Sequence, residues 1–110
     1  MRSLHHPRTE EISLEDVLHA LSDPVRLKIV EAIADREEER NCSSVEASVS
    51  KSTLSHHFKV LREAGVTHTR ANGTQRLISL RRDDLEGRFP GLLDSILVAA
   101  RSVSQVTPRV

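Results

Sequence analysis

The sequence predicts a small, mainly α-helical domain that carries one β-hairpin. Apolar residues recur at helical spacing in several segments between residues 13 and 104. An Asn72-Gly73 pair separates two strand-like segments, which is the strongest short-range signal for a hairpin. The chain has 110 residues, of which 37% are apolar and 29% are charged, so it fits a single globular domain.

The first two helices are predicted at residues 13–21 and 24–35. Ser13 is expected to cap the first helix, because its hydroxyl is able to accept from a backbone N–H of the first turn. Asp23 is expected to cap the second helix in the same way. Pro24 suits the first helical position, where no backbone donor is needed.

The remaining segments of the first half have weaker patterns. Residues 1–12 show no apolar periodicity and are expected to form a flexible tail. Residues 35–40 are all charged, with both signs present, and are predicted to be a solvated connection. Residues 42–48 are predicted to form a short third helix.

A fourth helix is predicted at residues 51–64, with Ser50 as its N-cap and Gly65 as its C-terminal stop. After the hairpin, residues 83–89 are predicted to connect to a last helix at about residues 92–104. The expected domain organisation is a single domain with its core at residues 13–84, followed at residues 85–110 by a linker and the last helix.

The hairpin completes the predicted topology. Its strands are expected at residues 66–71 and 74–80, on either side of Asn72-Gly73. About five helices with a two-stranded hairpin before the last one are the elements of a winged helix-turn-helix domain, in which the hairpin is the wing.

Two motifs resemble the ArsR family of bacterial winged-helix repressors. The first is ALSDPVRLKIV at residues 20–30, which is similar to the family's opening signature. The second is SKSTLSHHFKVLREAGV at residues 50–66, which resembles the family's recognition helix. The resemblance covers residues 14–82 well and the last helix loosely. It implies a two-fold dimer, formed through the terminal helices, that binds an inverted-repeat operator in double-stranded DNA.

The charge distribution favours a polyanionic partner although the net charge is zero. Residues 51–82 contain seven Lys or Arg residues and one acidic residue, Glu63. Residues 1–50 contain six basic and eleven acidic residues. One contiguous third of the chain is therefore basic, which is typical of a localised nucleic-acid interface.

The predicted recognition helix has a buried and an exposed side. At 100° per residue, Phe58 and Leu61 lie within about 40° of Leu54, so these three residues form the buried stripe. The opposite side is polar, with short hydroxyl side chains that permit close approach to a major groove and cationic side chains beyond them. The residues of this helix predicted to contact DNA are Lys51, Ser52, Thr53, Ser55, His56 and Lys59.

Particular roles are expected for four side chains. His56 lies on the exposed side and is predicted to contact base edges. His57 lies about 60° from the buried stripe, so both a structural role and a base contact stay open. Arg70 and Arg76 flank the tip of the hairpin and are predicted to contact phosphates.

The last helix carries a wide band of apolar residues, which requires cover on two sides. The expected cover is the core of its own subunit and the same helix of a second subunit, joined by the first helix. The residues predicted at this dimer interface are Leu14, Leu18, Leu93, Ile96, Leu97 and Ala100.

No metal site and no cofactor are predicted. Many ArsR-type proteins bind metals through paired cysteines or through Asp, His and Glu ligands in the last helix. Here Cys42 is the single cysteine, and no His or Glu follows Asp94. A small organic inducer is possible, and its identity is not given by the sequence.

Three functions from different classes were weighed. The preferred one is a DNA-binding repressor. The alternative is a winged-helix module that docks an acidic protein, and steep loss of duplex binding with salt distinguishes the two. An enzyme that uses Cys42 with His56 or His57 is not expected, because no Gly-rich loop or orienting carboxylate accompanies them. Without a long apolar segment or a secretory signal, the protein is expected in the cytoplasm and not in a membrane.

Overall fold

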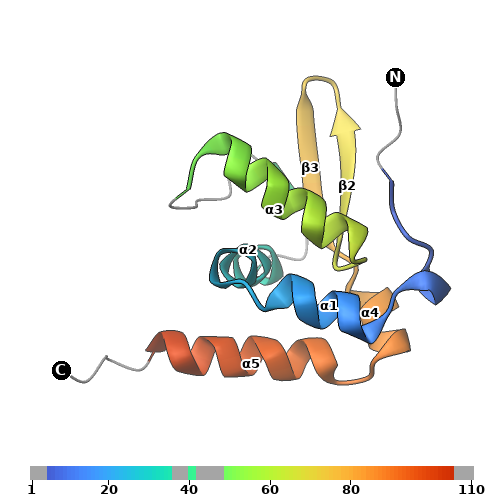
Figure 1. Ribbon diagram of the computed structural model, residues 1–110, viewed down its shortest axis with the longest axis vertical. Coiled ribbons are helices and arrows are strands. Elements are labelled where there is room, and N and C mark those ends of the chain that lie inside the picture. Colours follow the sequence, from blue (N-terminus) through green and yellow to red (C-terminus); the bar gives the residue numbers. More distant parts are fainter. Residues whose placement is uncertain (1–4, 36–39, 42–48, 106–110) are drawn as a thin grey trace.

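The computed structural model describes residues 5–35, 40–41 and 49–105. The predicted short helix at residues 42–48 lies outside the described residues. Helices pack in layers, with α5 along one side of the body and the β2–β3 hairpin projecting from the other (Figure 1). The described elements are η1 (Thr9–Glu11), α1 (Leu14–Leu21), α2 (Pro24–Ala34), β1 (Arg40–Asn41), α3 (Lys51–Glu63), β2 (Thr67–Asn72), β3 (Gln75–Leu80), α4 (Arg82–Arg88) and α5 (Leu92–Gln105).

The predicted caps of the three main helices are confirmed. The Ser13 hydroxyl accepts from the backbone N–H of Asp16 at 3.2 Å. The Asp23 carboxylate accepts from two backbone N–H groups at the start of α2, at 2.8 and 3.1 Å. The Ser50 hydroxyl accepts from the N–H of Thr53 at 3.3 Å. Each cap pairs a donor that the helix itself leaves without an acceptor.

The hairpin turn lies one residue later than predicted. Asn72 pairs with Gln75 across the antiparallel strands, so the two-residue loop is Gly73-Thr74. Gly73 has a φ of +64°, and no described residue other than glycine has a positive φ. The first loop position of a type II′ turn needs this conformation, which glycine adopts without steric cost, whereas Asn72 stays in the extended strand.

Two further elements differ from the prediction. Residues 82–88 form α4, where a connection was expected, because Leu85 is buried in the core and acidic residues stand in the first turn of the helix. The predicted charged connection ends in strand β1, which pairs with β3 in the order β1-β3-β2. The sheet is therefore three-stranded at its base, and only the hairpin continues toward the tip.

The core lies between the helices and the inner face of the sheet. Leu61 and Ile78 are fully buried, and Ile29 is 1% exposed. These residues come from α3, β3 and α2, so the recognition helix, the hairpin and the central helix share one core. The core thereby sets the position of α3 relative to the wing, which we define as the β2–β3 hairpin.

The prediction of a flexible tail at residues 1–12 is wrong for residues 5–12, which we call the arm. The arm contains η1, and Ile12 is 1% exposed within the core. Arginine side chains from the body of the domain donate to three carbonyl oxygens of the arm. The acceptors are backbone carbonyl oxygens, which every residue carries. Such contacts therefore leave no pattern of apolar residues in the sequence.

None of the helices in the described part of the chain is both long enough and apolar enough to cross a membrane.

Candidate DNA-binding interface

Helix α3 exposes every residue that the sequence predicted for DNA contact. Lys51, Ser52, Thr53, Ser55, His56 and Lys59 are all exposed. The Thr53 hydroxyl lies 3.0 Å from the Ser50 hydroxyl, so Thr53 also supports the cap of the helix. The outer side of α3 therefore presents small hydroxyl groups near its N-terminus and an imidazole and an ammonium group further along.

The opposite side of α3 holds the helix in the domain. Leu61 is fully buried, and Leu54 and Phe58 are partly buried against the core. Val60, one turn from His56, also packs on the core, through its partly buried side chain. The helix is therefore fixed along its length, and its polar side is presented as a rigid surface.

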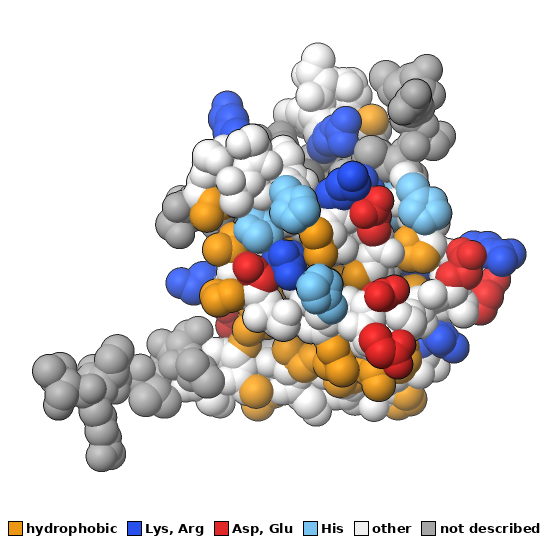
Figure 2. Space-filling view, in the orientation of Figure 1, with side chains coloured by type: hydrophobic (Ala, Val, Ile, Leu, Met, Phe, Trp, Pro, Cys, Tyr) orange, Lys and Arg blue, Asp and Glu red, His pale blue; other side chains and the backbone are white. Residues whose placement is uncertain are grey.

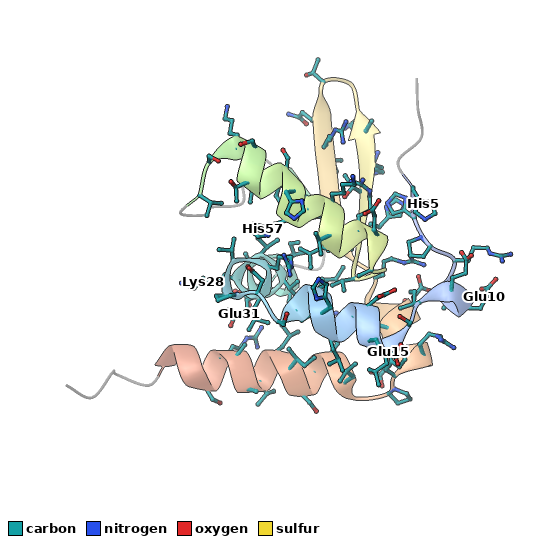
Figure 3. All side chains as sticks on the ribbon, viewed as in Figure 1. His5, Glu10, Glu15, Lys28, Glu31 and His57 are labelled. Carbon is teal, nitrogen blue, oxygen red and sulfur yellow. The ribbon has the colours of Figure 1, made fainter. Side chains whose placement is uncertain are left out.

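The structure assigns His57 to the interior. Its side chain is 8% exposed, and its Nδ1 accepts from the Arg26 guanidinium at 3.2 Å. Because arginine has only donors, His57 Nδ1 carries no proton in this contact, and the ring proton lies on Nε2. Figure 3 shows the His57 ring pointing from α3 toward the helices below it. His57 therefore orients α3 and does not belong to the exposed polar side.

Arg26 is a residue that the sequence reasoning missed. It is 8% exposed and also donates to the carbonyls of Ala20 at 2.7 Å and His19 at 3.3 Å. One buried guanidinium thus joins the end of α1, the start of α2 and the middle of α3. The signal in the sequence is a cation within the second helix, two residues after Pro24, where the neighbouring residues are largely apolar.

The start of α2 favours the ionised form of its capping residue. The backbone N–H of Arg26 is the main cause that lowers the pKa of the Asp23 carboxyl below its ordinary value; burial opposes it by raising the pKa, and the N–H of Val25 lowers the pKa further. At neutral pH the cap is therefore a carboxylate that accepts charge-assisted hydrogen bonds. This carboxylate stabilises the turn that precedes the Arg26–His57 contact.

The wing places one arginine on each of its faces. Arg70 pairs with Leu77 and Arg76 pairs with Ala71, and side chains of paired residues point to the same face. Arg76 therefore shares the face of Ile78, which is buried against the helices at the base of the sheet. Both arginines are exposed, but only Arg76 lies on the face of the hairpin that continues the core side.

Two other basic residues of residues 51–82 have contacts within the domain. Arg81 forms an ion pair with Asp84 at 2.9 Å and donates to the Pro7 carbonyl at 2.6 Å. The hydrogen bond from the Arg81 side chain lowers the pKa of the Asp84 carboxyl. Arg62 donates to the His5 carbonyl at 3.2 Å. These guanidinium groups stabilise the arm, so the number of basic residues overstates the number available to a ligand.

Opposite charges gather at different places on the surface. In the space-filling view, basic side chains stand over α3 and the wing, whereas acidic side chains gather over η1 and α1 (Figure 2). The exposed acidic residues of that region are Glu10, Glu11, Glu15 and Asp16. Such a dipolar surface orients a polyanion toward α3 and the wing and away from α1.

The predicted dimer interface is partly wrong. Leu93 and Leu97 are each 4% exposed and Ala100 is 8% exposed, because this stripe of α5 packs into the core of its own chain. Because they are four and three residues apart, these three side chains lie on the same side of the helix. Leu14 and Leu18 of α1, in contrast, are 40% and 46% exposed.

Other apolar side chains of α5 are exposed or half-buried. Val98 of α5 is 63% exposed, and Ile96 and Leu92 are half-buried. Val98 follows Ile96 by two residues, so these two side chains lie about 160° apart around α5 and do not share a face. Figure 2 shows apolar side chains gathered where α1 and α5 meet. We call Leu14, Leu18 and Ile96 the apolar face; they are the residues of the predicted interface that the core of the chain does not bury.

Within residues 5–35, 40–41 and 49–105, no three His, Cys, Asp or Glu side chains come together as a metal site would require. Cys42 lies outside these ranges. Four of the six histidines lie in pairs, with the His6 ring stacked on that of His68 and the His56 ring tilted against that of His57.

The sequence is similar to known helix-turn-helix proteins. A family model described as a helix-turn-helix domain matches residues 21–70. The chain is 38% identical over 82 residues to YceK of Bacillus subtilis, an uncharacterized HTH-type transcriptional regulator. The match covers 73% of this chain and 82% of that protein.

Solved structures give the same fold. The transcriptional repressor BigR from Xylella fastidiosa has a TM-score of 0.59 at 23% identity, and the match covers 88% of each chain. A homodimeric winged helix-turn-helix DNA-binding domain from Mycobacterium bovis, a possible ArsR-family regulator, has a TM-score of 0.61 at 21% identity, with 88% and 87% covered. The chain therefore belongs to the HTH-type transcriptional regulators, and its fold is the winged helix-turn-helix fold of these solved structures.

Proposed function

We propose that this protein is a repressor that binds an inverted-repeat operator as a two-fold homodimer. The observation that carries this proposal is the exposed polar side of α3 next to a wing with exposed arginines. In the proposed complex, α3 of each subunit enters the major groove of one half-site, and the two half-sites lie about one helical turn apart.

The residues of α3 have separate roles in this proposal. His56 contacts base edges, with Ser52 and Ser55 beside it, because their short side chains allow the helix to approach the groove closely. Lys51 and Lys59 contact phosphates. Their contribution is independent of sequence and decreases with salt.

The wing contributes phosphate contacts outside the major groove. Arg76 is the stronger candidate, because it lies on the face of the wing that continues the core side, on which α3 also packs. Arg70 lies on the other face of the wing. It reaches a DNA phosphate only where one edge of the wing enters a groove of the duplex. The acidic surface over η1 and α1 disfavours the opposite orientation of the domain.

The apolar face is proposed as the dimer interface. Leu14 and Leu18 are two of the large apolar residues that stand exposed among the described residues, and both belong to α1. A clustered apolar surface on a small globular domain is typical of an association site. Ile96 adds to the same surface, whereas Leu93, Leu97 and Ala100 support it from the core.

Further parts of the proposal concern regulation and location. We infer that the protein is not an enzyme, that it acts in the cytoplasm, where the operator is, and that it needs no cofactor. Its release from DNA is attributed to a small organic inducer or to the amount of protein alone.

The test selects bound sequences from a pool of random duplexes and measures the affinity at increasing salt. A DNA-binding dimer selects an inverted repeat, and the logarithm of its affinity falls linearly with the logarithm of the salt concentration. Preference for an acidic protein over every duplex supports instead the alternative of a protein-interaction module. The absence of a two-fold repeat in the selected sites contradicts the proposed dimer.

A further inference from the structure

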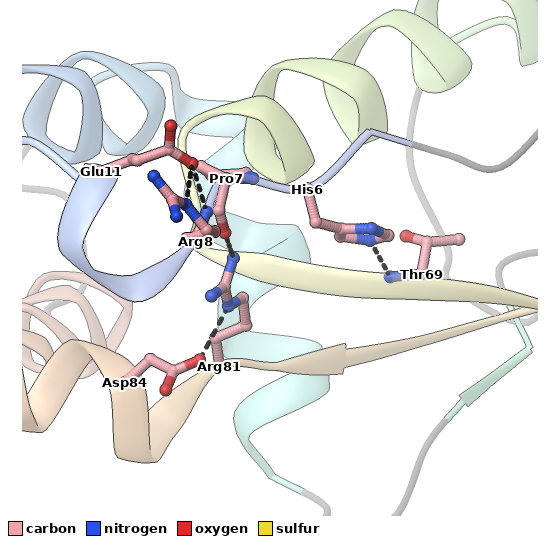
Figure 4. A network of polar contacts seen from close by, with 7 residues as sticks. All are labelled: His6, Pro7, Arg8, Glu11, Thr69, Arg81 and Asp84. Carbon is pink, nitrogen blue, oxygen red and sulfur yellow. Dashed lines mark hydrogen bonds and ion pairs between the residues drawn. The ribbon is translucent and has the colours of Figure 1, made fainter.

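The arm, residues 5–12, contacts parts of the domain that come from distant places in the sequence. Figure 4 shows the arm beside the hairpin, with His6 facing Thr69 of β2 and Pro7 facing Arg81, which follows β3. The arm is held along its length by hydrogen bonds to side chains and by two buried residues, Pro7 and Ile12. A segment without helical or strand periodicity gains such contacts for a structural or a functional reason.

The C-terminal end of the arm is anchored in the body. Ile12 is 1% exposed, and its carbonyl accepts two bonds from the Arg88 guanidinium, at 2.6 and 3.2 Å. A Cβ atom at Gly65 would lie 2.6 Å from the Ile12 side chain, and Gly65 has a φ of +87°. The end of α3 is therefore shaped so that the arm crosses it closely.

The N-terminal half of the arm is hydrogen-bonded to Arg81, which follows β3, and to Arg62 of α3. The Pro7 carbonyl accepts from Arg81 at 2.6 Å, and the same guanidinium is held by Asp84 at 2.9 Å. The His5 carbonyl accepts from Arg62 of α3 at 3.2 Å. The arm is thus fixed relative to the recognition helix through a hydrogen bond to that helix itself.

The wing is contacted by His6. The backbone N–H of Thr69 donates to His6 Nε2 at 3.0 Å, and the His6 ring stacks on that of His68 at 4.4 Å between centroids. Strand β2 is at the edge of the sheet, and the Thr69 N–H that donates to His6 lies on the outer side of this strand, away from β3. His6 supplies the acceptor that a further strand would otherwise provide.

His6 acts at the level where the wing leaves the body. Thr69 pairs with Ile78 of β3, and Ile78 pairs in turn with Arg40 of β1. The hairpin is therefore flanked on the same row by His6 on one edge and by β1 on the other. Toward the tip, the hairpin continues through the pairs that include Arg76 and ends at Gly73.

We propose that the arm is a brace that sets the position of the wing relative to α3, and that His6 is a positioning residue for DNA binding. A two-stranded hairpin alone is marginally stable in water. A braced wing loses less conformational entropy when its arginines contact phosphates, so the brace strengthens binding without a DNA contact of its own. This inference rests on the proposed function.

The first experiment measures binding of the full-length protein to a mixed-sequence duplex at low salt by fluorescence anisotropy. His6→Ala removes the acceptor and is expected to weaken binding about three- to tenfold. His6→Gln keeps a neutral side-chain acceptor at similar reach and should restore affinity to within about twofold of the parent. His5→Ala is the matched control, because His5 contributes its main-chain carbonyl, which this variant keeps.

A double-mutant cycle separates positioning from a general loss of stability. In a background that carries Arg70→Ala and Arg76→Ala, the wing has lost its phosphate contacts, so His6→Ala should have little further effect. A merely structural role would weaken binding equally in both backgrounds and lower the melting temperature in parallel. An equal effect in the two backgrounds therefore overturns the proposal.

Hydrogen exchange of the Thr69 amide tests the contact without DNA. Exchange should be faster in His6→Ala than in the parent, and His6→Gln should restore protection. Unchanged exchange in His6→Ala overturns the brace. If the parent binds no duplex at all, the proposed function fails, whereas normal binding by His6→Ala together with weaker binding by the arginine variant overturns the brace alone.

Discussion

Helices α3 and α5 both pack one side into the same core, but their outer surroundings differ in chemistry. Outside the core, α3 presents hydroxyl, imidazole and ammonium groups, whereas α5 leaves Val98 exposed and Ile96 half-buried, and the neighbouring α1 exposes Leu14 and Leu18. A polar exposed side is typical of a surface helix, and an apolar one needs an explanation. The difference indicates two separate functional surfaces, one for DNA and one for a second subunit.

The two surfaces are joined by α2. This helix contacts both α3 and α5, and its buried Arg26 reaches His57 of α3. A change on the DNA surface should therefore leave the dimer intact, and a change on the dimer surface should leave the contacts of each subunit with its half-site intact. A change in α2 should alter the stability of both surfaces. The following predictions test this separation, in order of decreasing expected effect.

The largest effect is expected from Leu18→Asp. Leu18 is 46% exposed, so a charge there is tolerated by the folded monomer but is buried without a partner in the dimer. Sedimentation should show monomers, and affinity for the selected inverted repeat should fall about 100-fold or more, since each half-site is then bound independently. A stable Leu18→Asp dimer would place the interface elsewhere.

Leu97→Asp is the matched contrast, because Leu97 lies on the side of α5 that packs into the core. Leu97 is 4% exposed in the core of its own chain, so this change should unfold the protein and not yield a folded monomer. Circular dichroism during thermal unfolding distinguishes the two outcomes. If both variants remained folded and monomeric, Leu97 would belong to the interface after all.

A smaller effect is expected on the DNA surface. His56→Ala should cost about 1–3 kcal/mol on the preferred operator and relax the choice of base at one position of each half-site. Lys59→Ala is the control, because loss of a phosphate contact should weaken all duplexes alike and reduce the salt slope by about one. Equal losses on specific and random duplexes for His56→Ala would show that His56 touches the backbone.

The cap of α2 should have a still smaller effect, shared by both surfaces. Asp23→Ala should lower the free energy of unfolding by about 1 kcal/mol at neutral pH without changing the ratio of specific to non-specific binding. Asp23→Asn should cost less, because asparagine also caps a helix.

The same cap makes a pH-dependent contribution with a defined sign. Hydrogen bonds from Arg26 and Val25 lower the pKa of Asp23 in the folded state. Its stabilising contribution is therefore complete above the unfolded value of about 3.9 and is lost as the pH falls through the lower folded value. Urea unfolding across this range should show the difference between the parent and Asp23→Ala narrowing in acid. A constant difference would contradict a role for the charge.

The sequence was sufficient for the elements whose signals are local. Ser13, Asp23 and Ser50 cap helices because a side-chain oxygen and the first-turn N–H groups are neighbours in the chain. Gly73 marks the turn because only glycine adopts its φ without cost. The polar side of α3 followed from 100° per residue, and Ser52, Ser55, His56 and Lys59 of that side are exposed.

Signals between distant residues were not predictable in this way. His6 and Thr69 are 63 positions apart, and Arg88 and Ile12 are 76 apart, so no periodicity relates them. On α5 the apolar band was evident, but its division between the chain's own core and a partner depends on where α2 and α4 pack. Leu97 was therefore assigned to the dimer interface, although it belongs to the core.

The last prediction is an expected absence of effect. Zinc, cadmium or arsenite at low micromolar concentration should not release the protein from its operator, because metal sites of this kind need three or four nitrogen, oxygen or sulfur ligands on rigid elements. The chain has one cysteine, and α5 carries no histidine. Each metal is titrated into the complex with the parent and with Cys42→Ser. Stoichiometric release that disappears in Cys42→Ser would mean that two subunits share a thiolate site, and it would then link the apolar face to the DNA surface through a ligand.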